Sequence, residues 1–226
     1  GVFLPIQNEL VAIWDPGLYL GQIYQIASEL AGFSPSAGPG KLMGLASYGF
    51  STPELINQLM KLFTTMNKTE TEKDFNILRR NILEKIEKYA PFVKLRPIAK
   101  KYNFVDLHKD CIGIATLTQS ICESLWAEKV KQIADFIRCS HLGPLEEIIL
   151  VGGFSLNCPS NHKVQKQLPN VNVLPLAGGA DMGTSIGAAK FASSLFRDNT
   201  MKIKRKSVLS SAFPPREIMT QNKELS

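Results

Sequence analysis

The 226-residue sequence has few of the patterns that mark membrane, metal or redox proteins. No apolar run approaches the length of about 18 residues that a membrane-spanning helix needs. The start of the chain has no basic segment followed by an apolar core, so no signal peptide is expected. Its four cysteines include no CxxC pair and its three histidines no HxxxH spacing, which argues against a zinc or redox motif. These absences favour a globular protein in a reducing, cytoplasmic setting.

Two further motifs are incomplete. Gly40-Lys41 lacks the surrounding residues of a P-loop, because Pro35 and Leu42 stand where a glycine and a Ser or Thr are required. The segment 153–157 follows a strand as a nucleophile elbow would, but its last residue is Asn157 instead of glycine, and no acid-then-histidine order follows. The sequence therefore argues against a P-loop NTPase and a serine hydrolase.

The net charge of +6 comes partly from a basic stretch at residues 202–206. No aromatic residues alternate with these lysines and arginine, so we interpret the stretch as a solvated connection and expect no nucleic-acid partner.

Apolar spacing predicts an α/β protein in which helices and strands alternate. The predicted strands are 148–151, expected to be buried on both faces, and 171–174. Residues 34–41 are expected to be an irregular loop because they are rich in Gly and Pro. The predicted helices are 19–31, 42–48, one that starts at Pro53 with Thr52 as its cap, one around 76–89, 110–139 and 181–196.

The expected organisation has two parts. Residues 1–198 are predicted to form one domain, within which the polar segment 51–109 is interpreted as a peripheral insertion. Residues 199–226 carry too little apolar surface for a core and are predicted to be a linker.

The most informative feature is a glycine pair, Gly152-Gly153, between a predicted strand and a helix. Glycine lets a ligand approach the backbone where any Cβ would collide. A second glycine turn precedes Asp181, and both turns lead into helix N-termini, which bind anions. The pattern indicates a phosphate-bearing ligand, with Asn157 suited to ribose or base edges and Asp181 to a divalent cation. The alternatives are a tight turn without ligand, and a helix cap at Asp181.

Three ordered blocks resemble the O-carbamoyltransferases of nodulation-factor and antibiotic biosynthesis (the NodU/CmcH type). Residues 38–49, GPGKLMGLASYG, resemble the family block G-x-G-K-x-M-G-L-A-x-Y-G. Residues 152–157, GGFSLN, resemble G-G-x-x-L-N, and residues 181–189 resemble D-x-G-T-x-x-G-A-A. The resemblance covers about 19–50 and 110–197 and is weak across 51–109.

The resemblance implies the C-terminal half of an actin-like ATPase (ribonuclease H-like) fold, a sheet flanked by helices with a helical insertion. It also implies similarity to the enzymes that attach threonylcarbamoyl to tRNA. The implied reaction uses ATP and carbamoyl phosphate to form carbamoyl-adenylate, from which the carbamoyl group passes to a hydroxyl of a small molecule.

Carried onto this chain, the resemblance implies that Asp181 is a ligand of a divalent metal ion of the Fe or Mg class. Gly40, Gly152, Gly153, Asn157 and Gly183 would border the nucleotide. Lys41 would lie near the adenylate as the catalytic cation.

The chain departs from the family in length. The histidine metal ligands of an N-terminal half and the C-terminal adenylate-forming domain have no counterpart in it, so the isolated chain is expected to be an inactive fragment that binds metal poorly. Two alternatives stay open: a sugar- or acid-kinase-like protein of the same fold, and a non-catalytic nucleotide-binding partner.

Overall fold

The computed structural model describes residues 2–6, 9–14, 20–35, 37–66, 81, 84–97, 109–140, 144–176, 178–179 and 181–196. It divides the chain into two compact units, residues 1–181 and 182–226. The elements are β1 (Val2–Ile6), β2 (Glu9–Trp14), α1 (Leu20–Leu30), α2 (Gly38–Ala46), β3 (Gly49–Phe50), α3 (Pro53–Met66), η2 (Ala90–Phe92), β4 (Lys94–Leu95), α6 (Lys109–Cys139), β5 (Glu147–Leu150), η4 (Gly153–Leu156), α7 (Cys158–Gln167), β6 (Asn172–Pro175) and α8 (Asp181–Phe196).

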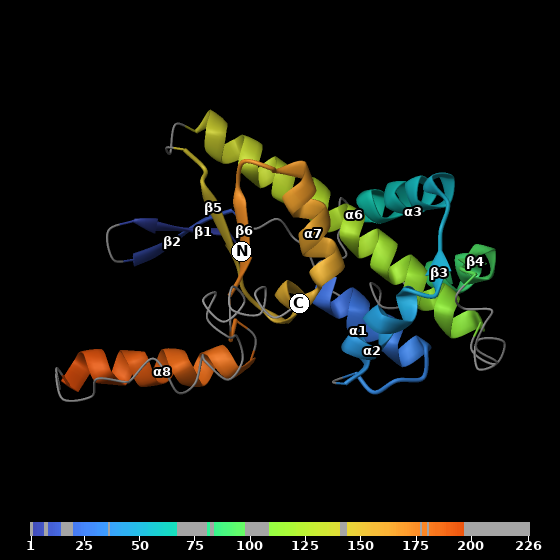
Figure 1. Cartoon of the computed structure of the whole chain (residues 1–226), viewed down its shortest axis with the longest axis horizontal. Helices are drawn as coiled ribbons and strands as arrows, with labels where there is room; N and C mark the ends of the chain where they lie inside the picture. Colours follow the sequence, from blue (N-terminus) through green and yellow to red (C-terminus); the bar gives the residue numbers. More distant parts are fainter. Residues whose placement is uncertain are drawn as a thin grey trace, which may run out of the picture. The chain divides into compact units, whose positions relative to one another are not determined.

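The long helix α6 organises the first unit (Figure 1). Around its N-terminal half, α1, α2, α3 and the segment 86–93 contribute to the first core cluster of buried apolar side chains. Along its C-terminal half, β5, α7 and β6 contribute to the second core cluster. Trp126 packs against both clusters, so one helix carries two neighbouring cores.

The mixed α/β class is confirmed, but the described part of the chain is mostly helical. Its strands form three separate two-stranded sheets, β1–β2 and β3–β4 antiparallel and β5–β6 parallel, in place of one sheet flanked by helices. No residue of the β1–β2 hairpin belongs to the core clusters found in the described ranges.

The helix α2 starts earlier than predicted. The sequence indicated an irregular loop up to Lys41 and a helix from Leu42, whereas α2 begins at Gly38. This prediction was wrong because Pro39 lies in the first turn, where a backbone N–H has no helical partner to lose. The predicted start of α3 at Pro53 is confirmed, with the Leu55 N–H donating to Thr52 Oγ1 at 3.4 Å.

The strand β5 is covered on one face only. Leu150 is 5% exposed, but Ile149 is 57% exposed and pairs in register with Leu174 of β6, which is also exposed. The prediction of a strand buried on both faces was therefore wrong. A continuous apolar run is typical of a strand inside a large parallel sheet. Here the sheet has two strands, and the second core cluster covers only one of its faces.

The segment 51–97 contributes side chains to the first core cluster, namely Leu55, Leu59, Ile86, Ala90 and Val93. A Cβ on Gly113 of α6 would lie 2.5 Å from the carbonyl oxygen of Ala90. That distance is too short for any side chain, so η2 lies directly on the α6 backbone. Whether 51–109 is an insertion stays a prediction, and 67–80, 82–83 and 98–108 lie outside the described residues.

Candidate functional site

The two glycine turns of the first unit lie side by side. β5 and β6 are parallel, so their carboxyl ends meet at the same edge. There the Gly152 N–H donates to the carbonyl oxygen of Gly179 at 2.8 Å, while the Gly179 N–H closes its own turn onto Leu176 at 2.8 Å. The glycine pair and the glycine turn that precedes Asp181 therefore meet at Gly152 and Gly179.

The backbone of Gly152 requires glycine. Its φ of 92° and ψ of 166° fall in a region that residues with a Cβ avoid. Beside both Gly152 and Gly153, a Cβ would meet no atom of the described residues within 4 Å. The backbone at this edge is therefore open, and only the first of the two glycines has a conformational reason to be glycine.

Asn157 lies just after this turn, and its side chain is buried. Its Oδ1 accepts from the Ser160 N–H at 3.1 Å, which caps the N-terminus of α7. Its Nδ2 donates to the Tyr24 hydroxyl at 3.0 Å and to Gln119 Oε1 at 3.2 Å. The amide that was expected to face a nucleotide thus uses both of its polar atoms within the protein, where it fixes η4 and α7 to α1 and α6.

Tyr24 and Gln119 complete this buried network, and the sequence analysis did not identify either as part of the site. The Tyr24 hydroxyl donates to Gln119 Oε1, and Gln119 Nε2 donates to Asn157 Oδ1 at 3.0 Å and to Glu123 Oε1 at 2.7 Å. Burial, followed by the charge of Cys122, raises the pKa of Tyr24 far above its usual range, so the phenol stays protonated and can donate. The signal that could have found Gln119 is a polar residue inside a long apolar helical stripe.

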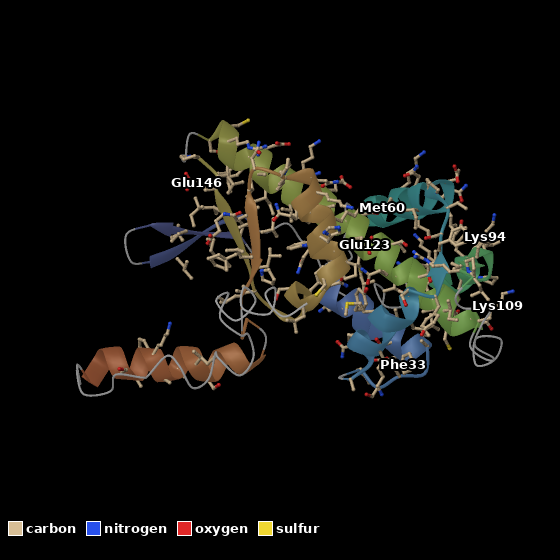
Figure 2. The ribbon with its side chains drawn as sticks, viewed as in Figure 1. Phe33, Met60, Lys94, Lys109, Glu123 and Glu146 are labelled. Carbon is tan, nitrogen blue, oxygen red and sulfur yellow. The ribbon has the colours of Figure 1, made fainter. Side chains whose placement is uncertain are left out.

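The block at residues 38–49 is linked to the glycine turn through α1. The Tyr24 ring of α1 lies 5.9 Å from the Phe154 ring of η4, and α1 also packs against α2. Gly40 and Lys41 are exposed on α2, with Lys41 Nζ 6.0 Å from the centre of the Phe33 ring (Phe33 is labelled in Figure 2). Lys41 is therefore accessible to an anionic ligand.

Asp181 and Gly183 stand in the first turn of α8, whose residues from Met182 onward belong to the second unit. The second unit is described by itself, and the Asp181 side chain lies outside the described residues, so the roles of Asp181 and Gly183 stay predictions. Within the described ranges, no group of three or more His, Cys, Asp or Glu side chains could hold a metal ion. The described residues thus do not fit a metal centre.

Comparison with known proteins gives two relatives. The chain is 38% identical to the uncharacterized protein MJ1058 of Methanocaldococcus jannaschii over 65 residues, which are 28% of this chain and 11% of that protein. It is 24% identical to the uncharacterized protein sll1178 of Synechocystis sp. over 211 residues, 91% of this chain and 32% of that protein. The chain therefore spans at most about a third of the length of these relatives.

No helix in the described ranges combines the length and hydropathy of a membrane span.

A family model agrees with the resemblance found from the three motifs. The model for the carbamoyltransferase N-terminus matches residues 6–190, which include the glycine pair and the block at 38–49. Because this match covers well over half of its length, the chain belongs to the carbamoyltransferase N-terminus family.

Proposed function

We propose that this chain forms the nucleotide-binding part of an ATP-dependent carbamoyltransferase. The whole enzyme would transfer the carbamoyl group of carbamoyl phosphate to a hydroxyl of a small molecule. The whole enzyme would also contain an N-terminal half and a C-terminal adenylate-forming domain. Residues 1–198 would be the C-terminal half of an actin-like domain and 199–226 the linker that follows it.

One observation carries the nucleotide proposal. The hydrogen bond from Gly152 to Gly179 joins two glycine turns at the carboxyl edge of a parallel strand pair. In open α/β sheets, ligands bind outside the carboxyl ends of the strands. The open backbone at Gly152 and Gly153 supports the fit, because a phosphate could approach the chain there without meeting a side chain.

The proposed roles follow from this placement. Gly152 and Gly153 border the phosphates. Asn157 holds these two glycines in place, because it anchors the segment after the turn to Tyr24 and Gln119. Gly40 and Lys41 are exposed on α2. Gly40 is proposed to border the nucleotide, and the Lys41 ammonium group to bring a positive charge to its phosphates. Gly183 and Asp181 are proposed to approach from α8, as the family resemblance implies.

ATP supplies the free energy that activates the carbamoyl group for attack by a hydroxyl. The chain's own contribution is to bind and orient the nucleotide with backbone N–H groups, which can donate hydrogen bonds directly to an anion. Lys41 offsets negative charge on the phosphates. No step is assigned to a metal ion, because the described residues hold no cluster of metal ligands.

Titration calorimetry with ATP, with and without Mg²⁺, tests the proposal on the chain and on Gly153→Glu. Gly153 is exposed and has no neighbour within 4 Å of a Cβ, so the glutamate should leave the fold intact. It should repel and exclude the phosphates, lowering ATP affinity at least about tenfold, which corresponds to 1.4 kcal/mol.

The matched control is Asn170→Glu, because Asn170 is exposed in the turn that precedes β6, at the opposite edge of the parallel β5–β6 pair from Gly153. It should change ATP affinity less than about twofold, because the added charge lies a strand length from the phosphates and is screened. The proposal is wrong if the chain binds no ATP, or if both glutamates weaken binding equally.

A further inference from the structure

A polar cavity lies between α6 and the elements α2, β3, α3 and α7, and neither Gly152 nor Gly153 lines it. Its volume is about 570 Å³, within the range of small-molecule sites. Most of the side chains around it are polar, and five of these polar side chains come from α6, while α3 and α7 contribute Asn57 and Lys163. The lining residues that carry the argument are Phe50, Asn57, Arg96, Ser120, Glu123 and Lys163.

The floor of this cavity is a polar stripe on α6. Thr116, Gln119, Ser120, Glu123 and Ser124 are spaced as neighbours on one helical face. From Thr116 to Ser124 the stripe is about 12 Å long at the helical rise of about 1.5 Å per residue. A length of this order suits a sugar-sized molecule with one substituent.

Hydroxyl and amide groups dominate the lining. The hydroxyls of Ser51 and Ser120 lie 2.9 Å apart, and Ser124 Oγ accepts from Lys163 Nζ at 3.1 Å. Glu123 Oε1 accepts from Gln119, which leaves the carboxylate with further acceptor capacity. Asn57 is exposed at the rim on α3. Such groups bind alcohols by donating and accepting hydrogen bonds.

Two cations stand at opposite ends of the stripe. Arg96 Nε donates to the carbonyl oxygen of Gly49 at 2.9 Å, and Gly49 packs against Thr116 at one end. At the other end, Lys163 Nζ donates to Ser124 Oγ, and the Glu123 carboxylate lines the same cavity. Within the described part of the chain, neither cation forms an ion pair. Among the described residues, no carboxylate pairs with Arg96, and the only hydrogen bond of its guanidinium is the one that Nε donates to Gly49.

We propose that this cavity binds a hydroxyl-rich anion of the hexose phosphate class. Arg96 binds the phosphate, for which a planar guanidinium is well suited. Glu123 and the serines of α6 bind the sugar hydroxyls, and the half-exposed ring of Phe50 offers a flat apolar surface to the sugar ring. This site goes beyond the proposed nucleotide function and does not depend on it.

The probe is glucose 6-phosphate, with glucose and inorganic phosphate as comparisons, measured by titration calorimetry and saturation-transfer NMR without nucleotide. The sugar phosphate should bind at least about tenfold more tightly than either fragment, because only it engages both the Arg96 end and the hydroxyl groups. Arg96→Gln should weaken it at least about tenfold, because a charge-assisted hydrogen bond is lost.

Two matched controls separate the cavity from its surroundings. Lys94→Gln removes an equal charge two residues from Arg96, outside the cavity, and should change affinity less than about twofold (Lys94 and Glu123 are labelled in Figure 2). Asn57→Trp, at an exposed rim position, should fill the cavity and abolish binding, whereas Gln58→Trp, its exposed neighbour outside the cavity, should not. Far-UV circular dichroism confirms that each variant is folded.

The proposal is overturned if glucose 6-phosphate binds no more tightly than inorganic phosphate, or not at all up to about 10 mM, where binding energy is only a few kcal/mol. It is also overturned if the Lys94 variant weakens binding as much as the Arg96 variant, or if folded Asn57→Trp binds normally.

Discussion

The buried network around Asn157 should make a large contribution to the stability of the first unit. The substitution Asn157→Ala removes four hydrogen bonds, to the Ser160 N–H, to the Tyr24 hydroxyl and, in both directions, to Gln119. The lost helix cap costs about 1 kcal/mol, and each of the other bonds contributes about 1 kcal/mol net. Because Tyr24 and Gln119 bond to each other and keep that bond, we expect a total loss of about 2–4 kcal/mol.

Urea unfolding followed by far-UV circular dichroism measures this loss. In a thermal scan of the same signal, the melting temperature of a chain of this size should fall by about 5–15 °C. Asn157→Ser keeps a side chain that caps helices as well as asparagine, so it should lose about half as much. Asn170→Ala, in an exposed turn, should change the free energy of unfolding by less than about 0.5 kcal/mol. A loss below 0.5 kcal/mol for Asn157→Ala, or equal losses for Ala and Ser, would refute the reasoning.

Three further predictions concern the same region. Gly152→Ala should cost about 1–3 kcal/mol in urea unfolding because its backbone conformation is nearly exclusive to glycine, whereas Gly153→Ala should be close to neutral. Burial raises the pKa of Tyr24 above that of an unfolded tyrosine, so the stability that its protonated phenol contributes is complete below about pH 10 and is lost as the pH rises further. The free energy of unfolding of Tyr24→Phe should therefore depend less on pH above about pH 10 than that of the parent chain. Burial also raises the pKa of the Cys122 thiol, so Ellman's reagent should modify it only after unfolding, while the native protein reacts at its exposed cysteines, Cys139 and Cys158.

Elements with strong periodicity were predictable from the sequence. The apolar stripe predicted a helix over 110–139 and α6 spans Lys109–Cys139, while both strands of the parallel pair were found within one residue. These elements are defined by local patterns of burial. The start of α2 was missed because glycine and proline content was given more weight than the position of Pro39 in the first turn.

The polar side chains of the site were harder to predict. Asn157 stands just before Cys158-Pro159, which is a helix-cap signal, yet its glycine neighbours drew attention to a ligand. Its partners Tyr24 and Gln119 are 133 and 38 residues away, so no local pattern could join them. The apolar spacing of α6 gives no sign of the cavity; the signal for it is the helical spacing of the polar residues of α6.

The contact between Gly113 and Ala90 has a consequence for how this sequence can vary. Any side chain at position 113 would overlap the carbonyl oxygen of Ala90, and that atom belongs to the backbone and cannot be removed by a second substitution. A homologue with alanine or a larger residue at this position must therefore reroute the segment around 90–93. In such a homologue, the neighbouring strand β4, which carries the chain to Arg96, should differ in length or register. Glycine at position 113 is thus a marker for homologues that keep the Arg96 side of the polar cavity.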